Sequence, residues 1–94
     1  METLDDQQIE AHLTGVDGWV RDGDAIVRDC KLSDFVAAIA LVDAVAVVAE
    51  QANHHPDILV HGWNRVRLTL STHSAGGLTG ADFALAAEID ALLP

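Results

Sequence analysis

The chain has 94 residues, half of them apolar, and a formal charge of −10 from fifteen acidic and five basic side chains. This length suits a single domain over residues 1–94, and the lone Cys30 has no partner for an internal disulfide. The negative charge disfavours binding to nucleic acid or to an anionic membrane surface. The acidic N-terminal stretch lacks the basic start and apolar core of a signal peptide, so we expect a cytoplasmic protein.

The first third of the chain predicts a short helix and a hairpin. Thr3 and Asp6 have the spacing of a capping box, which predicts a helix from there to about residue 13. Asp22-Gly23 is typical of a two-residue hairpin turn. It separates two expected antiparallel strands, Trp19–Arg21 and Ala25–Leu32.

A long apolar helix is predicted next, with Ser33 as its N-cap. From Phe35 to Ala49 the only polar residue is Asp43. Fifteen residues interrupted by an acid fall short of a membrane span. A soluble helix that is apolar nearly all round must bury two sides. We therefore expect one side of this helix to pack on the sheet and the other to pack against a second subunit of a homo-oligomer. Replacing Val45 or Val48 by Asp would test that interface.

The second half predicts two further strands and a last helix. Pro56 disfavours a helical conformation at His55, so the long helix should end near residue 52 or 53. Strands are expected over 57–62 and 64–72, and a capping box at Thr79 and Asp82 starts a helix to about residue 93. In the second strand, alternation directs Val66, Leu68 and Leu70 into the core. The order αββαββα predicts an α+β fold, a four-stranded antiparallel sheet with helices packed on one face.

Three of the five histidines lie within twenty positions, at 54, 55 and 73. The pair occupies a stiff elbow before the proline, and His73 follows Thr72 on the polar side of a strand end. Imidazoles can give or take a proton at neutral pH, so His54, His55 and His73 are candidates for one acid/base site. The alternative is that the pair only caps the end of the helix.

Other polar residues leave more than one interpretation open. Glu50 is either a ligand-holding carboxylate or a solvated acid, and helix capping alone accounts for Asp82. Three histidines with one of these acids could ligate a metal, but the helical spacings of metal motifs are absent, so no metal is expected. Trp19 and Trp63 suit a core or an interface, or could stack on a flat ring. His12 and His61 are taken as ordinary surface residues.

The pattern Glu50-x-x-x-His54-His55-Pro56-Asp57, with Thr72-His73, Gly77-Leu78-Thr79 and Asp82, resembles the pterin-4a-carbinolamine dehydratase family from about residue 18 to 93. The resemblance implies the αββαββα fold and a homodimer or homotetramer. It also implies dehydration of 4a-hydroxytetrahydropterin to quinonoid dihydropterin, which recycles the cofactor of aromatic amino-acid hydroxylases. The pterin is the substrate, and no further cofactor is implied.

By position, the resemblance makes His54, His55 and His73 the catalytic acid/base set. It makes Glu50, Pro56, Trp19, Thr72 and Asp82 substrate-binding or supporting residues. Asn53, Ile58 and Ala81 depart from residues common in the family, and these changes bear on pterin binding.

The resemblance also carries a second hypothesis. Some relatives on this fold are protein-binding modules, acting as a dimerisation cofactor or an assembly chaperone, and a fold does not determine a function. The apolar helix would serve that role as readily as self-association. A pterin-dependent hydroxylase or another protein is then a possible partner. Retention of the three histidines favours the enzyme.

Overall fold

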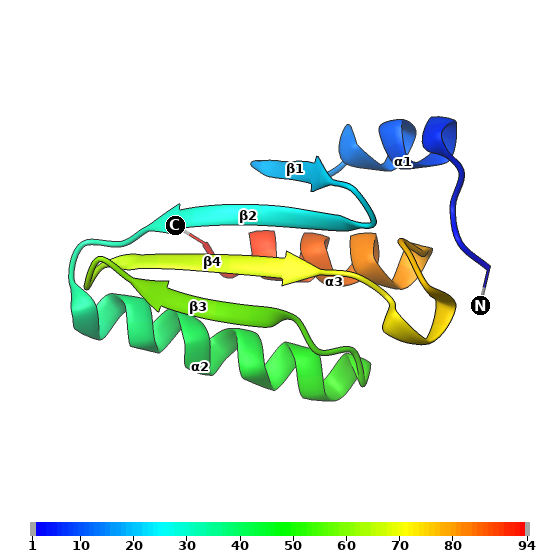
Figure 1. The fold of residues 1–94 in the computed structure, drawn as a ribbon. Coiled ribbons are helices and arrows are strands. Elements are labelled where there is room, and N and C mark those ends of the chain that lie inside the picture. Colours follow the sequence, from blue (N-terminus) through cyan, green and yellow to red (C-terminus); the bar gives the residue numbers. More distant parts are fainter. Residues whose placement is uncertain (1, 94) are drawn as a thin grey trace.

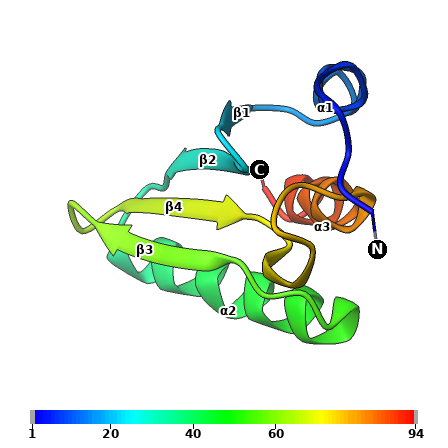
Figure 2. The same ribbon diagram turned by 45° about the vertical axis from the view of Figure 1, so that its right-hand side comes forward.

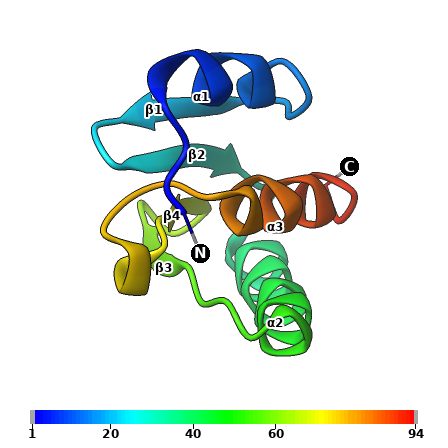
Figure 3. The same cartoon turned by 90° about the vertical axis from the view of Figure 1, so that its right-hand side faces the viewer.

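The computed structural model describes residues 2–93 and shows three helices against one antiparallel sheet (Figure 1). The strands lie in the order β1-β2-β4-β3, so the two hairpins pair through β2 and β4. Helices α2 and α3 cover one face of the sheet, and α1 lies beside β1 (Figure 3). The predicted αββαββα fold is confirmed. Its elements are α1 Asp6–Leu13, β1 Trp19–Asp22, β2 Ala25–Lys31, α2 Phe35–Ala52, β3 Asp57–His61, β4 Arg65–Leu70, the 3₁₀ turn η1 His73–Ala75 and α3 Gly80–Asp90.

The core lies between the sheet and the two covering helices. Side chains alternate across a strand, and Val66, Leu68 and Leu70 of the central strand β4 are fully buried, as predicted. Their neighbours across the ladder, Ile26 and Ile58, face the same layer. The opposite parity of the same strands forms an outer face that α2 and α3 do not cover (Figure 3).

Three local predictions are displaced by one or two residues. The capping box of α1 is formed by Asp5 and Gln8 rather than by Thr3 and Asp6: the Asp5 side chain accepts the Gln8 N–H at 2.8 Å, and the Gln8 side chain accepts the Asp5 N–H at 2.9 Å. At α2 the N-cap is Asp34, whose Oδ1 accepts the Ala37 N–H at 2.7 Å, and Ser33 precedes it. The first hairpin loop is Gly23-Asp24, because Asp22 still pairs with Ala25.

Helix α2 ends at Ala52 because Asn53 adopts a left-handed conformation, with φ 49° and ψ 44°. The Asn53 N–H donates to the carbonyls of Ala49 and Glu50, which satisfies two groups at the helix end. Three residues then lead to β3, which begins at Asp57. The predicted end point is confirmed, and asparagine tolerates this conformation better than most side chains.

The C-terminal end of α3 is attached to the first hairpin through Asp90. Its Oδ1 accepts hydrogen bonds from Trp19 Nε1 at 2.8 Å and Arg28 Nη1 at 2.9 Å, and its Oδ2 accepts the Asp17 N–H at 2.9 Å. Arg28 also donates to the Asp17 carbonyl. Trp19 is 6% exposed, so its indole belongs to the packed core at this end of the molecule.

The side of α2 away from the sheet exposes large apolar side chains. Phe35, Val36, Ile39 and Val47 are between 36% and 75% exposed, whereas Val45 is fully buried against the sheet. Val45 therefore cannot test a subunit interface as expected from the sequence, and Val48 also packs in part against the core. Val36 or Val47 must replace them. The sequence predicts an apolar run of fifteen residues, which is too short for a membrane span, but α2 has 18 residues. Among the helices between residues 2 and 93, α2 therefore has a length and composition that could cross a bilayer.

Candidate active site

The site is built where three chain segments meet at one end of the sheet. These are the α2–β3 connection, the segment that follows β4, and the first turn of α3 (Figures 1 and 2). The first carries His54 and His55, the second carries Thr72 and His73, and the third carries Asp82. Segments up to 28 residues apart in the sequence are joined here by side-chain hydrogen bonds.

Asp82 is the centre of the hydrogen-bond network. It is fully buried, and its Oδ2 accepts the Thr79 N–H at 2.9 Å and the Thr72 hydroxyl at 2.8 Å. The Thr79 bond completes the predicted capping box of α3. The Oδ1 atom lies 2.5 Å from Nε2 of His54. Helix capping thus accounts for only one oxygen of this carboxylate, and the other holds an imidazole.

His54 is oriented by this contact. Its side chain is 14% exposed, and its backbone N–H is held by the Ala49 carbonyl at 3.1 Å. Both Asp82 oxygens act as acceptors when the carboxylate is ionised, so the contact favours the ring form in which Nε2 carries the hydrogen. The second nitrogen, Nδ1, then has a lone pair for a proton from another molecule. An acid that fixes the tautomer of a neighbouring histidine is a frequent arrangement in catalytic sites.

His55 forms a second, more open pair. Its Nε2 lies 2.8 Å from Oε1 of Glu50, and the two side chains are 58% and 76% exposed. Glu50 is in the last turn of α2, five residues before His55, so the helix end positions both groups. Exposure of this degree leaves the ring accessible to a ligand from solvent.

His73 begins the 3₁₀ turn η1 after β4 and is exposed. Its neighbour Thr72 is buried and bonds Asp82 and, at 2.8 Å, the Thr79 hydroxyl, which anchors the base of the turn. A bridge between Thr72 and Gly77 closes the loop. The structure thus brings the predicted His73 to the end of the molecule that holds His54 and His55.

The three remaining candidates are Pro56 and the two tryptophans, Trp19 and Trp63. Pro56 separates the histidine pair from β3, where its ring stiffens the elbow. Trp19 is not brought to this cluster, because its indole bonds Asp90, eight residues along α3 from Asp82 and about 12 Å away along the axis. Trp63 is 63% exposed in the β3–β4 turn, on a residue with positive φ.

One residue of the network was not anticipated as part of the site. Thr79 was predicted only as a helix cap, yet its buried hydroxyl also contacts Thr72. The signal in the sequence was the repeated polar residues at both ends of a glycine-rich turn. No group of three or more potential metal ligands is gathered within residues 2–93. The site contains imidazoles next to carboxylates, and such groups can donate and accept protons in general acid–base catalysis.

Comparison with known proteins gives the class of this chain. The family model described as pterin 4 alpha carbinolamine dehydratase matches residues 2–92, so the chain belongs to that family. A protein of Nocardia farcinica named "Putative pterin-4-alpha-carbinolamine dehydratase" is 55% identical over 97% of this chain and 95% of its own length. A Roseiflexus castenholzii protein of the same name is 51% identical over 96% of each chain.

Two solved structures share the fold. A transcriptional coactivator/pterin dehydratase from Brucella melitensis is 33% identical, covers 99% of this chain and all of its own, and superposes with a TM-score of 0.93. A pterin dehydratase-like protein identified as a RuBisCO assembly factor in the alpha-carboxysome is 28% identical, with a TM-score of 0.67, over 80% of this chain and 88% of its own. The family thus includes members named for protein assembly as well as for pterin chemistry.

Proposed function

We propose that this protein is a pterin-4a-carbinolamine dehydratase. The observation that carries the proposal is the joining of His54 to buried Asp82 at the same end of the sheet as the His55–Glu50 pair and His73. A helix-capping role for the histidines does not explain this, because the Asp82 contact lies across 28 residues of sequence.

The reaction needs one proton donor and one proton acceptor. The bond between C4a and the hydroxyl oxygen breaks, and a proton from one imidazole lets the oxygen leave as water. The N5–H proton passes to another group, and its electron pair forms the C4a=N5 bond of quinonoid dihydropterin. His54, His55 and His73 supply these roles, and coupled imidazoles can exchange them between the two faces of the substrate.

Glu50 and Asp82 act as supporting carboxylates in this proposal. Asp82 holds His54 from the buried side, and Glu50 holds His55 from the solvent side. An ionised carboxylate beside an imidazole stabilises the protonated ring formed when it acts as base. Thr72 and Pro56 shape the site, and Trp19 is left out of it because its indole is bonded at the other end of α3.

The test is the decay of 4a-hydroxytetrahydropterin, followed by ultraviolet absorbance. We expect the purified protein to accelerate the decay, and His55→Ala and His73→Ala to lose most of that acceleration while remaining folded, because both side chains are exposed. His61→Ala, an exposed histidine on β3, is the matched control and should retain full activity. Full activity in His55→Ala and His73→Ala, equal to that of His61→Ala, would contradict the histidine mechanism.

A protein-binding module is the second candidate, and the exposed apolar side of α2 favours it. One of the two similar structures is named as an assembly factor and the other as a coactivator/dehydratase. Decay at the spontaneous rate with the wild-type protein would support this candidate, and the accelerated decay expected above would favour the enzyme.

We also propose that the exposed side of α2 joins copies of this chain in a homodimer or homotetramer. Val36→Asp and Val47→Asp should shift the protein to smaller species in sedimentation velocity, because a buried unpaired charge disfavours an interface. Val20→Asp is a matched control, since Val20 is 67% exposed on β1, away from α2. An unchanged sedimentation coefficient in both α2 variants would contradict the interface.

A further inference from the structure

The outer face of the sheet gathers most of the positive charge in this acidic protein. Of five Lys and Arg residues, Lys31, Arg65 and Arg67 lie on that face. Lys31 is directly opposite Arg65 in the β2–β4 ladder, and Arg65 is directly opposite His61 in the β3–β4 ladder. Like charges in directly opposed positions destabilise a sheet. The opposed pair of Lys31 and Arg65 therefore has an electrostatic cost that folding alone does not explain.

In the described part of the chain, three of the five Lys and Arg side chains form ion pairs with carboxylates, and two do not. Each of the other arginines has a carboxylate partner: Arg21 with Asp6, Arg28 with Asp90, and Arg67 with Asp29. No carboxylate within residues 2–93 forms an ion pair with Lys31 or Arg65, although the chain has fifteen acids. The two cations without such a pair are thus the two that face each other across the ladder.

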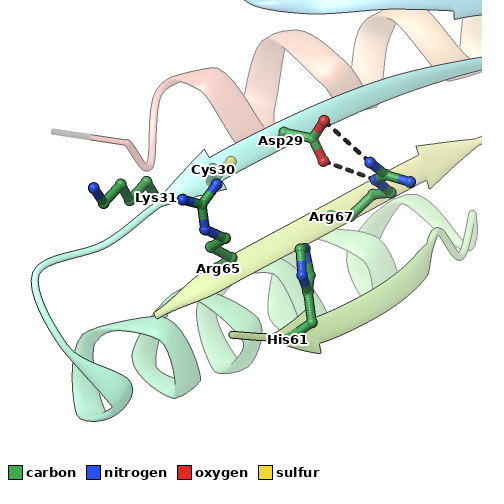
Figure 4. A pocket seen from close by; sticks show the side chains of 6 residues that line it. All are labelled: Asp29, Cys30, Lys31, His61, Arg65 and Arg67. Carbon is green, nitrogen blue, oxygen red and sulfur yellow. Dashed lines mark hydrogen bonds and ion pairs between the residues drawn. The ribbon is translucent and has the colours of Figure 1, made fainter. Parts of the chain in front are cut away.

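These side chains surround a hollow of about 180 Å³ on the outer face (Figure 4). Its lining residues are Asp29, Cys30, Lys31, His61, Arg65 and Arg67. Asp29 accepts from Arg67 Nε at 2.8 Å, and this bond lowers the pKa of Asp29, with smaller contributions from nearby His61 and Arg65. Asp29 therefore stays ionised and neutralises Arg67. The remaining charge of the hollow belongs to Lys31 and Arg65, with His61 beside them.

We propose that this hollow binds the phosphate group of a small molecule. The guanidinium of Arg65 and an N–H of His61 are the first donors, and such groups form charge-assisted hydrogen bonds with phosphate oxygens. Arginine is suited to this because its planar fork can bind two oxygens at once. The side chain of Lys31 extends away from these two in Figure 4, so its ammonium joins the phosphate by a change of side-chain rotamer. A bound dianion would also offset the repulsion between Lys31 and Arg65.

The size and surroundings of the hollow restrict the ligand. Towards β1 the same face continues with Val20, Asp22 and Val27, which offer no further cation. The net charge of the whole chain repels extended polyanions. A single phosphate therefore fits better than a nucleic acid. The hollow opens on the face opposite α2 and α3, so the inference does not depend on the proposed dehydratase reaction.

The first experiment is a titration of ¹⁵N-labelled protein with inorganic phosphate at constant ionic strength. We expect saturable shifts confined to the paired ends of β2, β3 and β4 around Lys31, His61 and Arg65. Arg65→Gln should weaken phosphate binding about tenfold or more, the loss expected of one charge-assisted hydrogen bond. Arg21→Gln changes the net charge equally at a distant ion pair and should bind phosphate as the wild type does.

The outcomes that overturn the proposal are distinct. Shifts that do not saturate, or an affinity unchanged in Arg65→Gln, would exclude a site at the hollow. Acetate binding as tightly as phosphate would refute the ligand class. A further readout is thermal unfolding: phosphate should raise the Tm of the wild type but not of Arg65→Gln, and without phosphate the variant should be at least as stable. A clear loss of stability without phosphate would show that Arg65 serves the fold instead.

Discussion

Asp82→Asn is expected to lower turnover of 4a-hydroxytetrahydropterin by about 10²–10⁴-fold, the range over which a positioned acid/base group contributes. The amide oxygen can still accept from Thr72 and Thr79, so the α3 cap survives. The amide N–H₂ would then face His54 Nε2, where Asp82 Oδ1 now lies at 2.5 Å. That arrangement favours the opposite tautomer and places the hydrogen on Nδ1.

The measurement is the absorbance decay over a range of pH, with circular dichroism to establish the fold. A changed tautomer should alter the pH profile as well as the rate, which a purely structural defect would not do. Glu88→Gln is the matched control, because Glu88 is an exposed acid on the same helix. Wild-type turnover in folded Asp82→Asn would show that the His54–Asp82 contact is not part of catalysis.

Leu68→Ala is expected to reduce the free energy of unfolding by about 2–5 kcal/mol, the range for a fully buried leucine whose cavity cannot collapse. Leu68 is fully buried on the central strand β4, between Arg28 of β2 and Ile58 of β3. The neighbouring strands and the covering helices hold the cavity open, because each is fixed by its own pairing and packing.

Leu59→Ala is the matched control, since Leu59 lies on adjacent β3 but is 52% exposed on the outer face. This variant should lower the free energy of unfolding by about 0.5 kcal/mol or less, as other surface substitutions do. Urea unfolding followed by tryptophan fluorescence measures both variants, because Trp19 is buried in the folded protein and exposed on unfolding. Losses of similar size would contradict the assignment of the inner and outer faces.

Predictions from local pattern succeeded where one segment contains the whole signal. The alternation of Val66, Leu68 and Leu70 has the period of a strand, so their burial follows from local geometry. The end of α2 was predicted from Pro56, although Asn53 provides the cap. Predictions of N-caps were less accurate, because neighbouring residues such as Ser33 and Asp34 can each cap a helix and only the folded backbone selects one.

The candidate site is only partly predictable from the sequence. The three histidines follow from their clustering and the supporting residues from the family resemblance, but the local sequence around Asp82 predicts nothing beyond a cap. Its second role needs Thr72 and His54, which the chain brings to it only when β4 and α2 dock on α3. Trp19 shows the reverse, because a residue expected near the substrate is bonded to Asp90 at the other end of that helix.

The elements, their order, the inner faces of the strands and the clustering of histidines are predictable from the sequence. These depend on side-chain periodicity, turn residues and residue type, which act over a few positions. The contact of Asp82 with His54, the burial of Val45 and the alignment of Lys31, Arg65 and His61 across three strands depend on the folded chain. Contacts of this kind join distant segments, and strand register and helix docking set them after the local elements have formed.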